Sequence, residues 1–405
     1  MKFGTVRVSR CAMKVASVLM LCALCFSQAR GQTSSPGTTP SQSAAPPANT
    51  AQKPLMSEDA FKNIQVLRGI PVKEFMETMG FFAASLSLNC TDCHGEDSAG
   101  DWSKYATDTR LKEMARRMIV MVNVINKGDF GGSRAVTCYT CHRGAEIPKV
   151  TPSLAEQYSA PPPEDPDEVE ILETPETSPT VDQILDKYIQ AVGGGAKLAS
   201  FSGKGTYGGY DTDFQEVPVD VFAKAPDERA VIVHLENGDS SSIYDGRNAW
   251  LAAPETLTPV PVLPLVGADL EGAQLDAELS FPGAIKQKLM SWRAGFPPTT
   301  IADHMVEIVE GRTPGGMRVK LYFDKDSGLL VRQVRYTNTA VGVTPTHIEY
   351  SDYRPVAGVK IPFRWTVTWV DGQSTIKLTD VQPNVTVPAA KFAQPAPPTA
   401  PTKKP

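Results

Sequence analysis

The stretch that decides the N-terminal fold reads VKEFMETMGFFAASLSLNCTDCH, residues 72–94. Its first half places apolar side chains every three or four positions, which predicts an amphipathic helix, and Cys90, Cys93 and His94 follow after a short loop. The same order returns further along the chain, where a second amphipathic segment precedes CYTCH at residues 138–142. The two segments therefore form a repeat of helix, loop and Cys-x-x-Cys-His.

The spacing within each Cys-x-x-Cys-His motif has a covalent explanation. Two cysteines three positions apart can each form a thioether to one vinyl group of the same haem, and the adjacent histidine then lies against the iron. A four-cysteine zinc site would place its pairs about 15 to 20 residues apart, and zinc or two redox disulfides would leave both histidines unused. The sequence predicts two covalent c-type haems, with zinc and disulfides as the alternatives. The expected attachment residues are Cys90, Cys93 and His94 for the first haem and Cys138, Cys141 and His142 for the second.

A six-coordinate iron needs a further ligand opposite its histidine. The three other histidines, His234, His304 and His347, all lie in the C-terminal half of the chain, so we do not expect two histidines on one iron. Methionine is therefore the expected further ligand. Five of the twelve methionines fall between residues 76 and 121, and core packing is the alternative role for each. A thioether opposite histidine raises the haem potential and closes the iron to peroxide, which favours electron transfer over catalysis.

The composition of the N-terminal region predicts export. Residues 1–31 hold five basic and no acidic side chains around a twelve-residue apolar core, which is typical of a cleaved signal peptide. Residues 32–56 are rich in Ser, Thr, Pro and Ala and predict a disordered linker ahead of a dihaem domain at 57–150. No apolar run reaches the ~18 to 20 residues of a full transmembrane helix. We expect a periplasmic protein, with membrane association as an open alternative.

The chain becomes acidic between the two halves. Residues 151–180 are rich in Pro and carry seven carboxylates between Glu164 and Glu176. This composition predicts a stiff linker whose acidic run is solvated, and a docking strip for a basic partner is the alternative.

The remaining sequence predicts a helix followed mostly by strands. Thr180 and Gln183 can form a capping box at the start of that helix, and alternating apolar residues then recur through residues 181–392. Asp371-Gly372 is predicted to form a hairpin turn between two of the strands. Several such strands with one helix in front indicate a curved antiparallel sheet, and residues 393–405 are predicted to be a disordered tail.

The charge of the chain limits its partners. It has 40 Lys and Arg against 45 Asp and Glu, a net charge of −5, and no basic stripe, so nucleic-acid binding is excluded. After removal of residues 1–31, 35 basic and 45 acidic side chains remain, a net charge of about −10. We therefore expect redox protein partners that are basic or quinone-linked.

The residues around the two motifs resemble a known family, the cytochrome c subunit of photosynthetic reaction centres, over roughly residues 57–150. The resembling segments are FMETM at residues 75–79, ARRM at 115–118 and VTCYTCHRG at 136–144. In that family a methionine from the preceding helix is the sixth ligand of each early haem. Carried over by position, the resemblance implies Met79 for the haem on His94 and Met118 for the haem on His142. The family usually carries four haems, whereas this chain has two motifs, so the resemblance implies a dihaem electron carrier and leaves its partner open.

Short phrases in the C-terminal part resemble the periplasmic lipoprotein-carrier fold, at residues 185–194, 244–246 and 353–362. That fold is a half-barrel of antiparallel strands with helices closing an apolar cavity. The resemblance implies a domain that binds an acyl chain or quinone-like apolar ligand, or that docks a partner by its sheet.

These patterns together predict a multidomain protein. A small, mainly α-helical c-type dihaem domain is followed by an α+β domain with a curved antiparallel sheet, a half-barrel. We hypothesise a periplasmic electron carrier rather than a catalyst. Two alternatives stay open: a dihaem peroxidase-like enzyme with one five-coordinate iron, and a hydrophobic-ligand carrier whose haems act as a sensor.

Overall fold

The computed structural model describes residues 52–161, 165–168, 177–194, 197–297 and 299–398. The predicted signal peptide at 1–31 lies outside these residues, as do most of the predicted linker at 32–56 and the end of the tail at 393–405. None of the helices in the described ranges is long and apolar enough to cross a lipid bilayer. All described residues belong to one compact unit, Ala51–Pro405.

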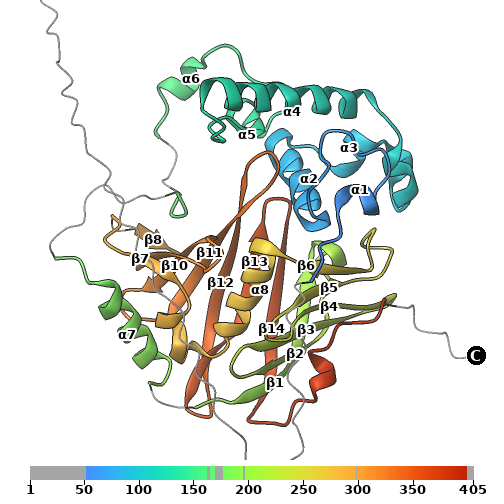
Figure 1. Ribbon diagram of the computed structural model, residues 1–405. Helices are drawn as coiled ribbons and strands as arrows, with labels where there is room; N and C mark the ends of the chain where they lie inside the picture. The colour runs from blue at the N-terminus through green and yellow to red at the C-terminus, as the bar shows by residue number, and fades with distance from the viewer. Residues whose placement is uncertain (1–51, 162–164, 169–176, 195–196, 298, 399–405) are drawn as a thin grey trace, which may run out of the picture. The chain divides into compact units, whose positions relative to one another are not determined.

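The N-terminal part of this unit is helical, as the sequence predicted (Figure 1). The first long helix starts after Pro71, because the residue before a proline is disfavoured in helical conformation, and it ends at Ser87 with a left-handed φ of 52°. Thr109 caps the second long helix by accepting a hydrogen bond from the Lys112 backbone N–H. The helices are α1 (Ser57–Ala60), α2 (Val72–Leu86), α3 (Cys90–His94), α4 (Arg110–Asp129), α5 (Cys138–His142) and α6 (Leu154–Gln157), with 3-10 turns η1 (Glu96–Ser98) and η2 (Trp102–Ala106).

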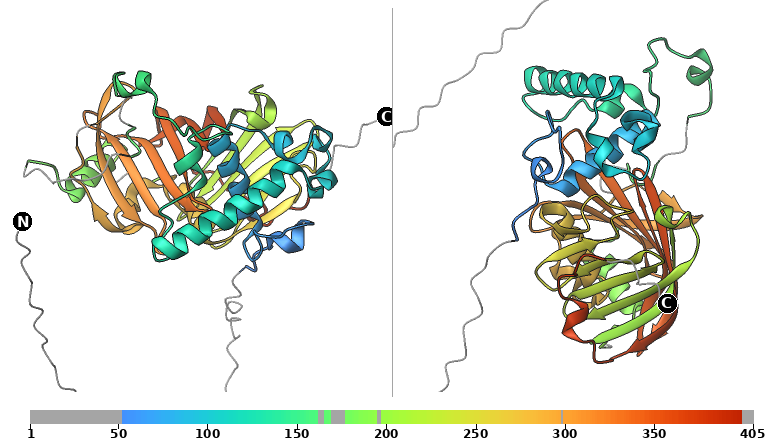
Figure 2. Two further views of the ribbon diagram at one scale, coloured as in Figure 1. Left: turned by 90° about the horizontal axis from the view of Figure 1, so that it is seen from above. Right: turned by 90° about the vertical axis from the view of Figure 1, so that its right-hand side faces the viewer.

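The C-terminal part is an antiparallel sheet of fourteen strands. From β1, strands β2 to β6 follow in chain order to one edge of the sheet. On its other side β1 pairs with β14, and strands β13 to β9 and then β7 follow in reverse chain order to the other edge. The sheet therefore joins two meanders. Figure 2 shows that this sheet is strongly curved, which confirms the predicted curved antiparallel sheet. The strands are β1 (Ser200–Gly209), β2 (Val217–Lys224), β3 (Glu228–Leu235), β4 (Gly238–Tyr244), β5 (Ala249–Ala252), β6 (Val262–Leu265), β7 (Met290–Arg293), β8 (Thr299–Ile301), β9 (His304–Arg312), β10 (Arg318–Asp324), β11 (Leu330–Asn338), β12 (Val343–Val356), β13 (Val359–Trp369) and β14 (Gly372–Pro383).

Two helices pack on the sheet, α7 (Val181–Ala191) and α8 (Gly267–Glu278). The predicted capping box starts α7: the Gln183 N–H donates to Thr180 Oγ1 at 3.2 Å and the Thr180 N–H donates to Gln183 Oε1 at 2.8 Å. The buried side of α7 then packs against the apolar face of β10. The local capping box and the apolar side of the helix therefore position α7 on the sheet.

A glycine allows the close approach where the two meanders join. The register of β1 against β14 shifts between Lys204 and Gly205. A Cβ at Gly205 would lie 2.0 Å from the Lys377 carbonyl oxygen, so no other residue fits there without moving the backbone. Such an irregularity increases the local twist of the sheet.

The hairpin between β13 and β14 turns one residue earlier than the sequence predicted. Trp369 pairs with Gly372, so the turn consists of Val370 and Asp371. The predicted turn, Asp371-Gly372, was therefore misplaced by one residue, because Gly372 takes part in the strand pairing.

Part of the acidic segment is anchored on the sheet. Among residues 165–168, Asp167 is only 7% exposed. Arg332 Nη1 donates to its Oδ1 at 2.9 Å, His347 Nε2 lies 3.5 Å from its Oδ2, and the Tyr336 hydroxyl donates to its carbonyl oxygen at 2.7 Å. The expectation of a solvated acidic run was wrong at this position, because β11 and β12 supply cationic and hydroxyl partners.

We expect Asp167→Ala to lower the free energy of unfolding by about 3 kcal/mol, because the substitution leaves the half-buried Arg332 with one fewer carboxylate. Urea unfolding followed by circular dichroism measures the change. Glu168→Ala is the matched control, since Glu168 is exposed and adjacent. Equal stabilities of the two variants would contradict the anchoring role of Asp167.

Candidate haem-binding sites

The first Cys-x-x-Cys-His motif forms the one-turn helix α3. Asn89 caps it by accepting hydrogen bonds from the Thr91 and Asp92 N–H groups at 3.0 and 3.1 Å, and the Asp92 carboxylate accepts from the Asn89 N–H at 2.8 Å. Residues three apart in a helical turn share one side, so the cap places Cys90 and Cys93 next to each other. Both are free thiols, with Cys90 exposed and Cys93 half-buried.

The second motif forms α5 in the same manner. Thr140 Oγ1 accepts from the Thr137 N–H at 3.0 Å, which caps the turn that carries Cys138 and Cys141. Buried Asn126 on α4 holds the approach to this turn, because its Nδ2 donates to the Val136 carbonyl at 2.7 Å and its Oδ1 accepts from the Val136 N–H at 2.9 Å. Both cysteines are free thiols, Cys138 half-buried and Cys141 exposed.

Both motif histidines have the same ring orientation. His94 Nδ1 lies 3.1 Å from the Tyr105 carbonyl oxygen, and His142 Nδ1 lies 3.0 Å from the Ala145 carbonyl oxygen. A carbonyl only accepts, so Nδ1 must carry the proton, and Nε2 keeps its lone pair. A backbone carbonyl that accepts from one ring nitrogen and so fixes the tautomer is typical of histidines that bind a metal through the other nitrogen. The geometry therefore fits an iron at Nε2 of each ring.

Partial burial favours the neutral forms of titratable groups in both motifs. Desolvation lowers the pKa of His94, and it raises the pKa of the Cys90, Cys93 and Cys138 thiols. Neutral imidazole is the form that ligates a metal.

The two repeats hold each other together. The Gly144 N–H, just after α5, donates to the Ser85 carbonyl of α2 at 2.9 Å, and Ser87 Oγ donates to the Gly144 carbonyl at 2.6 Å. In the opposite direction, Thr109 Oγ1 at the start of α4 donates to the Cys93 carbonyl of α3 at 2.5 Å. Each motif is thus also held by the helix of the other repeat.

The two methionines implied by the resemblance lie on α2 and α4. Met79 is partly buried in the apolar cluster formed by Leu67, Phe81, Ile119 and Val341, where Cys138 also packs. Met118 is half-buried on α4. Their assignment to the irons on His94 and His142 stays a prediction.

Two supporting residues were missed by sequence reasoning. Tyr105 receives the His94 hydrogen bond through its backbone and lies with its ring centroid 4.6 Å from that of His94, and neither role has a sequence signal. Asn126 had a signal, because it is an amide four positions after Val122 on the buried side of α4. A buried polar side chain of this kind needs partners, and Val136 supplies them.

The four cysteines do not converge on one centre. Within the described ranges, no group of three or more His, Cys, Asp or Glu side chains is arranged to hold a metal ion. The three remaining histidines pair with carboxylates instead: His234 with Asp239, His304 with Asp324 and His347 with Asp167. The arrangement fits two separate cofactor attachments better than one four-cysteine site.

Residues 27–166 match the family model described as photosynthetic reaction centre cytochrome C subunit. The curated relatives include the photosynthetic reaction center cytochrome c subunit of Thermochromatium tepidum, 37% identical over 108 residues, which are 25% of this chain and 25% of the relative. The subunit of Roseobacter denitrificans is 36% identical over 101 residues, 23% of this chain and 26% of the relative. The chain thus spans about a quarter of the length of these relatives.

Solved structures resemble the C-terminal part. A LolA superfamily protein from Nitrosomonas europaea superposes with a TM-score of 0.37 at 14% identity, over 53% of this chain and 98% of that one. A DUF1329 family protein from Desulfovibrio piger superposes with a TM-score of 0.38 at 12% identity, over 53% of this chain and 97% of that one.

Proposed function

We propose that this protein is a periplasmic dihaem c-type cytochrome that transfers single electrons between redox partners. The match of residues 27–166 to the reaction-centre cytochrome family supports c-type haem, and the two Cys-x-x-Cys-His helices support two of them. The single observation that carries the proposal is the ring orientation of His94 and His142, which leaves Nε2 of each available to an iron.

The proposed organisation follows the sequence. A signal peptide at 1–31 exports the chain, the dihaem domain occupies 57–150, and the linker at 151–180 leads to the sheet domain at 181–392. The mature chain carries a net charge of about −10, which favours a basic redox protein as partner.

Each residue of the motifs has a distinct task. The paired cysteines would tether the cofactor, and the histidine would hold its iron at Nε2 while the backbone carbonyl accepts from Nδ1–H. Bound haem supplies reversible one-electron chemistry at its iron. Met79 and Met118 are the proposed sixth ligands, and a thioether in that position raises the potential. In each motif one attachment cysteine is half-buried, Cys93 or Cys138, and the other is exposed, Cys90 or Cys141.

We expect the purified protein to contain two covalent haems per chain in a pyridine haemochrome assay. Near-infrared magnetic circular dichroism of the oxidised form should show the methionine-to-iron charge-transfer band at both haems, and Met79→Ala should remove about half of it. The reason is that the thioether is the source of the band. Met76→Ala is the matched control, since Met76 lies on the same helix and is not a proposed ligand.

Fewer than one haem per chain would contradict the proposal. Two haems with a high-spin band at one of them in the wild type would instead indicate an open iron, and the peroxidase-like alternative would then be tested by peroxide turnover.

A further inference from the structure

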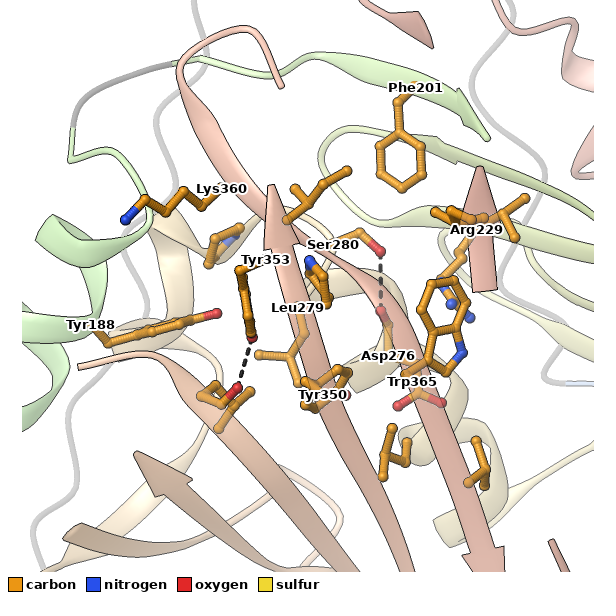
Figure 3. A pocket seen from close by; sticks show the side chains of 18 residues that line it. Tyr188, Phe201, Arg229, Asp276, Leu279, Ser280, Tyr350, Tyr353, Lys360 and Trp365 are labelled. Atoms are coloured by element: carbon orange, nitrogen blue, oxygen red, sulfur yellow. Dashed lines mark hydrogen bonds between the residues drawn. The ribbon is translucent and has the colours of Figure 1, made fainter. Parts of the chain in front are cut away.

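A cavity of about 540 Å³ lies between helices α2 and α8 and the sheet. Its size falls within the range of small-molecule sites, about 300 to 1,000 Å³. The lining of a smaller cavity of about 100 Å³ is drawn in Figure 3. The two cavities share Arg229, Asp276, Trp365 and Val367. In Figure 3 the side chains of Arg229 and Trp365 lie side by side, and the guanidinium carbon is 5.5 Å from the ring centroid.

Charged side chains gather where α2 borders this cavity. Lys73 Nζ lies 2.6 Å from Glu77 Oε1 and 3.8 Å from Asp269 Oδ1 of α8. The Asp371 carboxylate lies against the same helix, because a Cβ at Gly80 would be 2.8 Å from its Oδ2. One ammonium therefore faces three carboxylates at this border.

The strands supply the apolar part of the wall. Its apolar residues include Val231, Val233, Leu263, Leu265, Trp365 and Val367. A ligand that fills the cavity thus needs an apolar body and a polar head at the α2 border.

The charge of the border restricts the head group. The other two cations of the wall, Arg229 and Arg335, lie by Asp276, with Arg335 Nη1 3.0 Å from Asp276 Oδ2. The α2 border itself holds three carboxylates and one lysine, so a fatty-acid or phosphate head placed there meets net negative charge. A neutral head that both accepts and donates hydrogen bonds fits better, with Lys73 donating to an oxygen and Asp269 accepting from a hydroxyl.

Helix α2 connects the cavity to the proposed electron carrier. Lys73 and Glu77 of α2 line the cavity, and Met79, a proposed iron ligand, lies on the same helix. An α-helix with its side chains is only about 10 to 12 Å across, so a ligand in the cavity and a haem held by Met79 would be separated by one helix. A ligand in this position is suited to exchange electrons with the haem.

We infer that the cavity binds a hydroquinone with a short apolar tail, its head at Lys73, Asp269 and Asp371, as the reductant of the haems; the inference rests on the dihaem function proposed above. Oxidation to the quinone breaks the two O–H bonds of the hydroquinone. Its two protons pass to the Asp269 and Asp371 carboxylates and then to water, and its two electrons reduce two ferric haem irons, one each.

The carboxylates at the border are suited to receive protons. Burial raises the pKa of Asp269 to about 7, although the nearby Lys73 acts in the opposite direction. Burial also raises the pKa of Asp371. Both groups can therefore hold a proton closer to neutral pH than an ordinary aspartate does.

The direct test is binding of decylubiquinone, and of its anaerobically reduced form, to the haem-loaded protein by equilibrium dialysis. We expect one saturable site and, for the hydroquinone, reduction of two haems per molecule. Val367→Trp should weaken binding at least about tenfold by filling the cavity. Thr368→Trp is the matched control, since Thr368 is next to Val367 on β13 but lines neither cavity. The affinity of this variant should stay within about twofold of wild type.

Further variants keep the test decisive. If Val367→Trp does not fold, Ser241→Phe fills the same cavity from β4. Asp269→Asn should weaken hydroquinone binding more than quinone binding, because the neutral amide oxygen is a weaker acceptor for the hydroxyl than the charged carboxylate. Absence of saturable binding by a protein with two reducible haems would overturn this inference and leave the proposed function standing. Tighter binding of decanoate than of decylubiquinone would also overturn it, in favour of an acyl-chain carrier. If the purified protein binds decylubiquinone but carries no covalent haem, the result contradicts the proposed function instead.

Discussion

Replacing Cys138 and Cys141 together by alanine is expected to leave one covalent haem per chain and to abolish one of two waves in a potentiometric titration. The thioethers are the covalent attachment, and each pair serves one motif because the two pairs lie on separate one-turn helices. Intact-mass spectrometry counts the remaining haem directly. The paired substitution of Cys90 and Cys93 should remove the other haem and the other wave.

The two double variants should differ in stability. Each pair has one half-buried cysteine, but only Cys138 packs in the apolar cluster with Met79 and Phe81, and Cys93 is not part of that cluster. Truncating a packed side chain leaves a cavity, so the Cys138/Cys141 variant should unfold at a lower urea concentration than the Cys90/Cys93 variant.

Retention of two haems by either variant would contradict the assignment of the cysteine pairs to the two haems. Thr140→Ser, within the second motif but outside its cysteines, is the control that should keep both haems.

Gly342→Ala is expected to destabilise the protein by about 1 to 3 kcal/mol, because the hairpin between β11 and β12 meets α2 at this residue. A Cβ there would lie 2.4 Å from Cζ of Phe81, and this ring is itself 8% exposed. Phe81→Ala alone should cost about 3 to 5 kcal/mol, since it empties the centre of the cluster. Urea unfolding measures both changes.

A double-mutant cycle separates the clash from other effects. Phe81→Leu shortens the side chain that the new methyl would meet, so Gly342→Ala should cost less in that background than in the wild type. Gly128→Ala is the matched control: Gly128 lies in α4 with open space around it, and the same substitution should stabilise by about 0.5 to 1 kcal/mol. Equal costs of Gly342→Ala in both backgrounds would contradict a direct contact between Gly342 and Phe81.

Local patterns predicted much of the fold. The Thr180–Gln183 capping box and the start of α7 were correct because every atom involved lies within four residues. The alternating apolar residues expected through residues 181–392 lie in strands such as β2, β10 and β13, and this expectation was correct because side-chain direction in a strand depends on the backbone there. The turn at Asp371 was misplaced by one residue, because the register of β13 against β14 depends on packing along both strands.

The candidate site was predictable only in part. Cys90, Cys93 and His94 could be read from the sequence, because two thioethers and a ligand to one haem require that spacing. The carbonyl of Tyr105, which orients the His94 ring, could not be, because every residue has a carbonyl and only the folded chain selects one.

The sequence by itself determined the two Cys-x-x-Cys-His turns, the helices that precede them and the alternating strands, since each depends on contacts between residues close along the chain. Only the tertiary structure decided that β1 pairs with β14, that Asp167 is buried against Arg332, and that Lys73 lies 3.8 Å from Asp269. Partners so far apart in the sequence carry no local signal. Their meeting depends on the summed packing of the elements between them, and a carboxylate looks the same in the sequence whether it faces water or a buried cation.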